Sequence, residues 1–450
     1  MQKQGTNMIE GALLPNIIRY TIPIVLTSVL QLLFNAADLV IVGRFCGSLS
    51  VAAVGATTSL TNLLVNFFVG FSVGAGVAVA HALGGKEDQW AHRTVHTSLP
   101  MSLLCGAFVT ILGVGFSKTF LIWMGTPEDI LELSGIYMKI YFAGITFTMV
   151  YNFCAAILRA AGDTRSPLVY LTLAGVINVI LNVIFVTVFH MNVAGVALAT
   201  TISQGVAAAL VTRALMKRTD ACRLELKKMR FYGQQIQKIV RIGLPAGIQS
   251  SLFGISNVLI QSSMNSFGAV FVSGNAAAMN IEGFLFVSLN AFHQTAVNFI
   301  GQNVGARRYD RVKKTLGICL ASVTVLGLAV ACGLLAAGEK LLSLYITDSE
   351  QAIAYGMIRM TSMALPYFLC GMMDVSTGAL RGLGVSFVPM LISVLGVCGI
   401  RVLWIATIFP IPAFHTPQCL YLSYTVSWIV TLLFQLLAFR IVYRKRCIPS

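Results

Sequence analysis

Residues 16–41 read NIIRYTIPIVLTSVLQLLFNAADLVI, and this stretch decides the class of the fold. A membrane-crossing helix needs about 20 mainly apolar residues, because each residue adds about 1.5 Å along the helix axis. The stretch is long enough to cross a bilayer, and it carries one acid, Asp38, near its end. It therefore predicts a transmembrane helix with an ionisable group inside the apolar region.

The whole chain has the same apolar character. Of its 450 residues, 57% are hydrophobic and 10% are charged, so it cannot cover a water-soluble surface. The apolar runs are continuous, which favours helices over the alternating strands of a barrel. We predict an all-α integral membrane protein with twelve spans. Their limits are 16–41, 51–80, 94–117, 133–158, 167–189, 193–213, 238–266, 271–302, 312–336, 352–380, 387–409 and 418–440.

Basic residues are concentrated in alternate loops. The formal charge is +15, and it gathers mainly in residues 217–230, residues 307–314 and residues 444–446. Basic loops of this kind stay in the cytoplasm, and they indicate membrane topology far more often than nucleic-acid binding. We therefore predict a multi-pass protein of the inner (cytoplasmic) membrane, with both termini cytoplasmic and no nucleic-acid partner.

The chain aligns with itself at a shift of 222 residues in several separate places, with a slip of two residues in the loop between spans 2 and 3, which indicates a duplication. Each copy contains six predicted spans, so the two copies have the same orientation in the membrane. We predict an amino-terminal lobe at 1–213, a cytoplasmic linker at 214–237, and a carboxy-terminal lobe at 238–450 with a short basic tail. Matching residues include Arg19 and Arg241, Pro23 and Pro245, Asn35 and Asn257, Arg159 and Arg381, and Gly162 and Gly384.

No motif of an enzyme accompanies the spans. The run Gly84-Gly85-Lys86 lacks the earlier glycine and the following Ser or Thr of a phosphate-binding loop. The ten cysteines are scattered without a C-x-x-C pair, and the six histidines do not cluster. We predict that the chain is not an enzyme and has no cofactor, and that Na⁺ at Asp38 is the one metal ion to consider.

The strongest candidate for chemistry is Asp38. An ionisable side chain inside a span costs from about 2.5 kcal/mol upward, so it indicates function by default. Helical spacing places Gln31 and Asn35 on the same face as Asp38. The repeat places Ile260 at the position of Asp38 in the second half, so the acid is not kept for symmetry of the fold.

Further polar residues lie on the fifth and sixth predicted spans. Asn178 and Asn182 are four residues apart, and Thr200 lies on the next span. A single acid among amides and hydroxyls suits either a proton carrier or a sodium site. The alternative is that these groups only tie the spans together by hydrogen bonds.

The second half has charges of its own. Glu282 lies on the eighth span, Arg359 and Asp374 on the tenth, and Arg401 on the eleventh. Two of these groups form a structural ion pair, or one of them has a coupling role; the sequence leaves both readings open. Glu282 has no basic residue in its own span, so it is the better functional candidate, with Asp374 second. Candidates for lining a substrate cavity are Gln31, Met279, Phe284 and Tyr367, although such residues more often serve packing.

Five short motifs stand out along the chain. They are Asp38-Leu-Val-Ile-Val-Gly43, Val51-Ala-Ala-Val-Gly55, Gly301-Gln-Asn-Val-Gly-Ala306, Leu158-Arg-Ala-Ala-Gly-Asp-Thr164 and Leu380-Arg-Gly-Leu-Gly384. Together they resemble the multidrug and toxic compound extrusion (MATE) family over nearly the full length. The resemblance implies a V-shaped fold of twelve helices in two pseudo-symmetric six-helix lobes. It implies export of organic cations or drugs in exchange for H⁺ or Na⁺, with Asp38, Asn178, Asn182 and Thr200 at the cation site and Pro23 as the hinge of span 1.

Two positions depart from the family pattern. Many relatives have an acid where this chain has Asn182, and one branch has an acid where this chain has Phe253. Hard cations prefer charged oxygens, so the missing carboxylate favours H⁺ over Na⁺ as the coupling ion. Asp374 matches an acid of another branch.

The resulting prediction is a secondary antiporter that works by alternating access. We expect it to act as a monomer in the lipid bilayer and to export small amphipathic or cationic molecules, with Asp38 and Asn35 on the span that senses the ion. The alternative is a lipid-linked precursor flippase of a related fold. A flippase for anionic headgroups should concentrate Arg and Lys in the cavity-facing halves of spans 1, 2, 7 and 8, where this chain has few.

Overall fold

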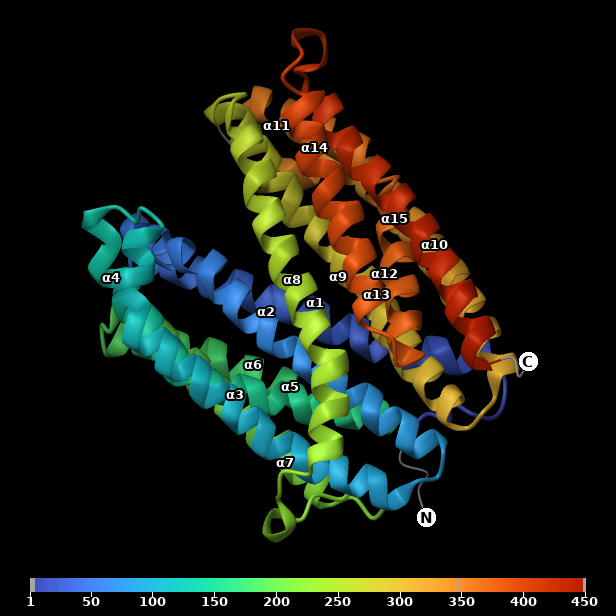
Figure 1. Ribbon diagram of the computed structural model, residues 1–450. Helices are drawn as coiled ribbons and strands as arrows, with labels where there is room; N and C mark the ends of the chain where they lie inside the picture. Colours follow the sequence, from blue (N-terminus) through green and yellow to red (C-terminus); the bar gives the residue numbers. More distant parts are fainter. Residues whose placement is uncertain (1–4, 347–348, 448–450) are drawn as a thin grey trace. The chain divides into compact units, whose positions relative to one another are not determined.

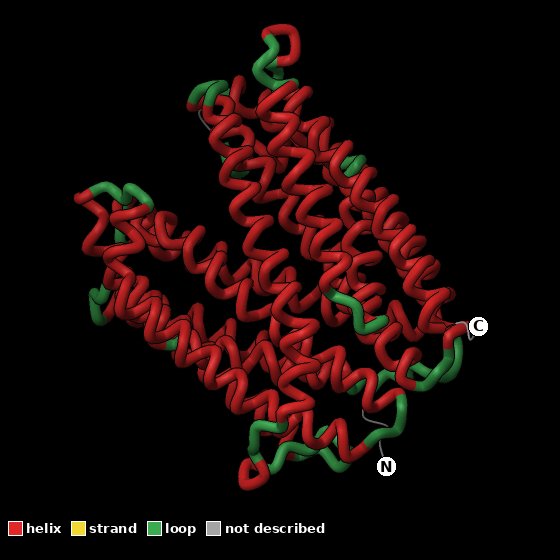
Figure 2. Tube along the Cα trace, viewed as in Figure 1, coloured by secondary structure: helices red, strands yellow, loops and turns green. Residues whose placement is uncertain are grey.

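The computed structural model describes residues 5–346 and 349–447. Within these ranges every regular element is a helix, and Figure 2 shows no strand there. The prediction of an all-helical protein is therefore confirmed. The two chain ends, predicted to be cytoplasmic, lie outside the described residues.

Each of the twelve predicted spans coincides with one helix or with a broken series of helices (Figure 1). The single helices are α1 (Leu13–Phe45), α2 (Ser48–Gly84), α3 (Asp88–Trp123), α7 (Asn192–Met216), α8 (Gly233–Asn265), α9 (Ala269–Gly305), α10 (Tyr309–Ser343) and α15 (Pro417–Cys447). The broken spans are α4 (Glu128–Ala143) with α5 (Ile145–Ala160), α6 (Arg165–Val183) with η1 (Ile184–Val188), α11 (Glu350–Met363) with α12 (Tyr367–Gly382), and α13 (Phe387–Ser393) with η3 (Val394–Gly399) and α14 (Ile400–Thr407).

Most of these spans are apolar enough to cross a membrane unaided. Nine stretches of the described chain pass this test of length and composition, and α4 with α5 makes a tenth where the pair counts as one span. The two remaining predicted spans are α8, which is rich in Gln and Ser, and α11 with α12, which carries Arg359 and Asp374 in its interior. Polar spans are tolerated when neighbouring helices satisfy their side chains.

Two spans break at equivalent positions of the repeat. The axis turns by 44° between α4 and α5, at Gly144. Pro366, which the repeat matches with Gly144, stands at the same junction between α11 and α12. A Cβ atom on Gly144 would lie 2.5 Å from the hydroxyl of Thr201, so only glycine allows α7 to approach there. Proline breaks the second span by a different route, because it has no backbone N–H to continue the helix.

The helix ends after α5 and α12 also repeat. Gly162 and Gly384 both have positive φ, 87° and 79°. The next residue in each case donates its backbone N–H to a carbonyl five positions earlier, at 2.9 Å from Asp163 to Leu158 and at 3.0 Å from Val385 to Leu380. Glycine favours this left-handed cap because it has no side chain. The duplication seen in the sequence thus extends to backbone geometry.

The chain divides into two compact units. Unit 1 contains Ile22–Gly247 and the residues before Met8, and unit 2 contains Met8–Thr21 and the residues from Ile248 onward. The divisions fall inside α1, just before Pro23, and inside α8, just after Pro245. The predicted lobes, with their linker at 214–237, stay a prediction, and the compact units have different bounds.

Direct contacts hold the first segment of α1 in unit 2. The hydroxyls of Thr21 and Thr295 are 2.8 Å apart, and the rings of Tyr20 and Phe299 meet edge to face with centroids 5.3 Å apart. Asn303 donates to the backbone carbonyl of Met8 at 3.0 Å. The segment that opens the first half of the sequence therefore packs against α9 of the second half.

The corresponding segment of α8 packs in unit 1 through glycines. Gly243 and Gly247 of α8 face Gly70 and Gly74 of α2. A Cβ atom on Gly243 would lie 2.5 Å from Cα of Phe71, and one on Gly74 would lie 2.9 Å from the backbone nitrogen of Gly243. Both helices carry a G-x-x-x-G pattern at this crossing, and small residues at this spacing let membrane helices approach closely.

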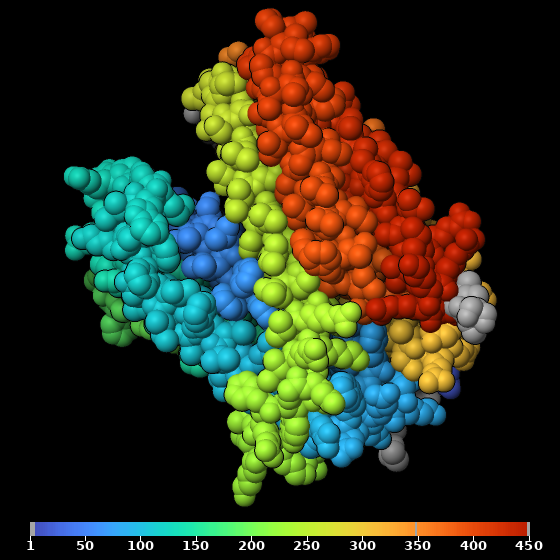
Figure 3. Space-filling view, in the orientation of Figure 1, coloured from blue at the N-terminus to red at the C-terminus, as the bar shows by residue number. Residues whose placement is uncertain are grey.

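The other helices pack in the same order in each unit. In unit 1, α2 contacts α3, α4 and α5, while α7 contacts α4, α5 and α6. In unit 2, α9 contacts α10, α11 and α12, while α15 contacts α11, α12, α13 and α14. Helix α15 is red in Figure 3. Large apolar side chains exposed along it include Leu433, Phe434 and Leu437. Apolar residues exposed along a predicted span suit contact with lipid.

Residues 217–232 join α7 to α8 and dock on α3. The backbone N–H of Glu225 donates to Nε2 of His96 at 2.9 Å, and the N–H of Tyr232 donates to the hydroxyl of Thr97 at 3.4 Å. Arg218 donates from Nε to both carboxylate oxygens of Asp220, at 2.9 and 3.1 Å. Burial alone would raise the pKa of Asp220, but the hydrogen bonds and the charge of Arg218 hold it below its ordinary value.

Candidate functional site

The predicted cation-site residues of the first half come together in unit 1. The amide of Asn182 on α6 donates to Oδ1 of Asp38 on α1 at 2.5 Å and to Oδ1 of Asn178 at 3.2 Å. The amide of Asn178 donates to the hydroxyl of Thr200 on α7 at 3.3 Å. Thr200 donates in turn to the carbonyl of Val196 at 3.0 Å. One hydrogen-bonded chain therefore connects α1, α6 and α7.

The local sequence explains this arrangement. Asn178 and Asn182 are one helical turn apart on α6, so their side chains share a face. Both are almost fully buried, at 5% and 0% exposure, while Asp38 and Thr200 are partly buried. The carbonyl oxygen of Asn182 is buried without a hydrogen-bond partner. It lies in the same side chain that donates to Asp38, so a carboxylate and an unused carbonyl stand close to each other.

No positive charge of the described chain balances Asp38. None of the ion pairs formed by the described residues includes it. The remaining neighbour of note is Tyr137 of α4, which is close enough for electrostatic interaction with Asp38. Its ring is stacked near Tyr141, with centroids 6.1 Å apart. Sequence reasoning missed Tyr137, because a tyrosine on an apolar span is ordinary.

Other predicted residues of α1 lie outside this network. Gln31 and Asn35 are exposed, and the hydrogen bonds of the described chain do not link either of them to Asp38. Pro23 lies inside the helix, and the hydroxyl of Thr27 donates to its carbonyl at 2.6 Å. The network therefore uses Asp38 but not the whole polar face predicted for α1.

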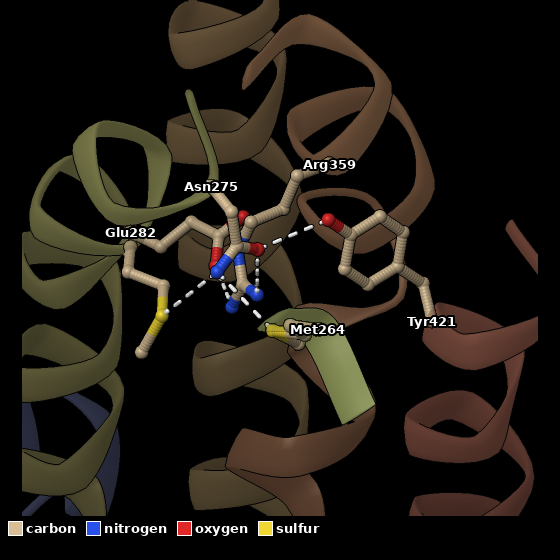
Figure 4. Close-up of polar contacts among 6 residues, drawn as sticks. Met264, Asn275, Glu282, Arg359 and Tyr421 are labelled. Atoms are coloured by element: carbon tan, nitrogen blue, oxygen red, sulfur yellow. Dashed lines mark hydrogen bonds and ion pairs between the residues drawn. The ribbon is translucent and has the colours of Figure 1, made fainter. Parts of the chain in front are cut away.

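Glu282 has a basic partner from another helix (Figure 4). Arg359 of α11 donates to Oε2 of Glu282 from Nε at 3.0 Å and from Nη2 at 2.8 Å. Both side chains are buried, with 1% and 4% of their surface exposed. Of the two readings that the sequence left open for this acid, the geometry is that of an ion pair. Glu282 has no basic residue in its own span, but Arg359 of another span pairs with it.

A shell of neutral groups surrounds this pair (Figure 4). Asn275 of α9 accepts from Nη1 of Arg359 at 2.9 Å and from the hydroxyl of Tyr421 at 3.0 Å. The amide of Asn275 points to the sulfur atoms of Met264 and Met279, at 3.2 and 3.5 Å. Asn275 and Tyr421 were missed in the sequence, since nothing there distinguishes them from other polar residues of the spans.

Asp374 belongs to a second polar cluster in unit 2. Nδ1 of His293 donates to the backbone carbonyl of Asp374 at 2.7 Å, and Nη1 of Arg381 donates to Nε2 of the same ring at 3.3 Å. Arg381 also donates to the side-chain carbonyl of Gln249 at 2.9 Å. The ring of His293 thus receives a hydrogen bond on one nitrogen and donates from the other, which is the pattern of a neutral imidazole.

The predicted cavity residues take varied positions. Met279 is exposed and touches the shell around Glu282, and Phe284 is partly buried. Tyr367 packs against Trp428 with ring centroids 5.2 Å apart. Their role in lining a substrate cavity stays a prediction. Across the described ranges, no group of three or more His, Cys, Asp or Glu is placed to hold a metal ion.

Comparisons with known proteins agree with this architecture. The family model MatE matches residues 23–184 and again residues 245–406. The two matches begin at Pro23 and at Pro245, a pair that the internal repeat of the sequence already relates. The family model thus matches the two halves of the internal repeat separately.

Curated relatives cover most of the chain. It is 25% identical over 391 residues to the probable multidrug resistance protein YoeA of Bacillus subtilis, covering 85% of this chain and 84% of that protein. It is 27% identical over 379 residues to the probable multidrug resistance protein YpnP of the same organism, covering 83% and 84%. The multidrug export protein MepA of Staphylococcus aureus is 22% identical over 399 residues, covering 86% and 88%.

Solved structures show the same fold. An outward-facing multidrug resistance MATE family transporter of the MOP superfamily matches with a TM-score of 0.91 and 21% identity, over 98% of both chains. A MATE structure in the bent conformation matches with a TM-score of 0.86 and 20% identity, over 96% of both chains. With the family model matching both halves, this chain belongs to the MatE family.

Proposed function

We propose that the chain is a cation-coupled antiporter that exports small amphipathic or cationic molecules by alternating access. Relatives named as multidrug resistance or multidrug export proteins support the substrate class. We further propose that it acts as a monomer in the cytoplasmic membrane with both termini in the cytoplasm. The clustering of basic residues in alternate loops supports this orientation.

The observation that carries the coupling proposal is the environment of Asp38. Its carboxylate accepts a hydrogen bond from Asn182 and forms no ion pair with a basic side chain of the described chain. A membrane-buried acid without a fixed countercharge is stabilised when it binds a proton or a small cation. Ion binding at Asp38 would change the charge at a point where α1, α6 and α7 are joined.

The hinge proposal follows from the position of Pro23. Proline cannot donate the backbone hydrogen bond that the carbonyl of Arg19 would otherwise accept, so α1 is weakened there. The change from unit 2 to unit 1 along α1 falls just before Ile22. We propose that ion binding at Asp38 alters the packing of the later part of α1 and that the helix bends at Pro23 in response.

The available driving force is sufficient for export. A proton that moves through about 150 mV releases about 3.5 kcal/mol, at roughly 2.3 kcal/mol per 100 mV. At about 1.4 kcal/mol per tenfold change, one proton supports a gradient of a few hundredfold for a substrate without net charge.

Asp38→Asn should abolish efflux while the protein still folds, because the amide keeps the size of the side chain but cannot take up a proton or a charge-paired cation. The measurement is ethidium accumulation in efflux-deficient cells that express equal amounts of each protein. Asp129→Asn, at an exposed position in the first turn of α4, is the matched control and should retain efflux. Equal efflux from Asp38→Asn and the unchanged protein would rule out the proposal.

We propose H⁺ rather than Na⁺ as the coupling ion, because Asn182 supplies an amide where a second carboxylate would favour Na⁺. In proteoliposomes, an imposed pH gradient should drive dye transport and a Na⁺ gradient alone should not. Asn182→Asp adds a second carboxylate to the site, so a Na⁺ gradient alone should drive dye transport by this variant. Asn265→Asp, at the exposed end of α8, is the control. A Na⁺-driven unchanged protein would refute the choice of ion.

A further inference from the structure

The acids of the two units have different partners. In unit 1, Asp38 has a neutral amide as its partner. In unit 2, Glu282 has the guanidinium of Arg359 on one of its two carboxylate oxygens. The duplication allows a comparison by position, because the repeat matches Arg359 with Tyr137, the neighbour of Asp38. Asp38 therefore has the neutral ring of Tyr137 as a neighbour, and Glu282 has the cation of Arg359 at the matching position of the repeat.

The groups around Arg359 form an enclosed site for a small cation. The guanidinium contacts Oε2 of Glu282 and Oδ1 of Asn275, and it lies over the ring of Tyr421 with 5.5 Å from Cζ to the ring centroid. These are a carboxylate, an amide carbonyl and an aromatic face, and each attracts a positive charge. The side chains come from α9, α11 and α15, so three helices supply the site (Figure 4).

The site also has an unused ligand. Glu282 is only 1% exposed, and its Oε1 atom is buried without a hydrogen-bond partner. A pair built only to stabilise the fold would be expected to satisfy both oxygens, because an unsatisfied buried acceptor costs about 1–3 kcal/mol. Arg359 uses a single oxygen of the acid and leaves the other unpaired.

We propose that Arg359 is a tethered cation that occupies a latent binding site for a small monovalent cation in unit 2, with Glu282, Asn275 and Tyr421 as the binding groups. While Arg359 is present, Glu282 binds no other cation and does not take up the coupling ion. This consequence for coupling rests on the proposed function. The existence of the latent site does not depend on transport.

The test uses ion binding to purified protein in detergent. All variants carry Asp38→Asn, which removes the acid of unit 1 and leaves unit 2 as the site to be measured. Arg359→Ala opens the site, and Glu282→Gln together with Arg359→Ala is the matched control that lacks the acid. The probes are millimolar guanidinium chloride and sodium chloride, with choline chloride at the same ionic strength as the reference.

Guanidinium should raise the thermal midpoint of the Arg359→Ala variant by at least about 3 °C over choline, because a ligand that binds only the folded state stabilises it. Sodium should give a shift of the same sign. The control without the acid, and the protein that retains Arg359, should show no shift. Equal shifts in the variant and its control, or no shift in either, would overturn the proposal.

A second variant covers the case in which Arg359→Ala is not recovered in choline. Arg359→Gln keeps a hydrogen-bonding side chain of moderate size and should respond to guanidinium in the same way. The yield of folded Arg359→Ala from membranes solubilised in guanidinium should then exceed the yield in choline, and this gain should require Glu282. Equal yields in the two salts would count against the site. None of these results depends on whether Asp38→Asn abolishes efflux, so the two proposals fail separately.

Discussion

Replacing Glu282 by Met should lower the free energy of unfolding by about 3–5 kcal/mol, because the guanidinium of Arg359 would stay buried without its acid. Arg359 is 4% exposed and receives its only ion-pair contact among the described residues from Glu282. Arg359→Met should be costly for the same reason, since it leaves a buried carboxylate unpaired. These are the losses expected from breaking a buried pair rather than from removing a surface one.

The double replacement tests whether the loss of stability in each single variant comes from breaking the ion pair. Glu282→Met with Arg359→Met puts two apolar side chains of similar volume in place of the charges, and it should be much less destabilising than either single change. Unfolding in mixed detergent micelles measures all three variants. Glu339→Gln, at an exposed position on α10, is the control for loss of a single acid. Additive losses in the double variant would mean that the two side chains do not interact.

Gly74→Ala should destabilise unit 1 by about 1–3 kcal/mol, the usual cost of forcing extra atoms into a packed interior. The new Cβ would meet the backbone carbonyl of Ile239 and the backbone nitrogen of Gly243. Backbone atoms of α8 cannot turn aside as a flexible side chain does, so the two helices would have to separate.

Gly55→Ala on the same helix provides the opposite expectation. No heavy atom lies within 4 Å of a Cβ built on Gly55, so alanine fits there. Alanine is a better helix former than glycine by about 1 kcal/mol, so this change should be neutral or stabilising. Thermal midpoints of the two purified variants decide the matter. A Gly74→Ala variant as stable as Gly55→Ala would show that the glycine crossing of α2 and α8 is looser than described.

Much of the fold follows from local properties of the sequence. The positions of the spans depend on runs of apolar residues, and each predicted run coincides with a helix or a broken helix. The duplication is also local information, because matched residues recur at one shift, and the caps at Gly162 and Gly384 confirm it in the backbone. The grouping of Asn178 with Asn182 follows from their spacing of one helical turn.

The partners of the buried charges do not follow in this way. Glu282 and Arg359 are 77 positions apart and lie on different helices, so their contact is decided by how α9 and α11 pack. Tyr137 and Asn275 take part in the two acid sites through the same tertiary packing. The exchange of the first segments of α1 and α8 between units is equally invisible, because it depends on which helices Thr21 and Gly243 meet after folding.

That exchange bears on how such a chain arose. In a protein encoded by one copy of the repeat, the first segment of the first helix would lack the second unit against which it packs in this chain. Two identical subunits solve the problem when each lends that segment to the other, as in a domain-swapped dimer. Fusion of the two genes would then preserve the swap, and the two halves of a fused chain need not stay identical: beyond the exchanged segments, α1 carries Asp38 where α8 carries Ile260.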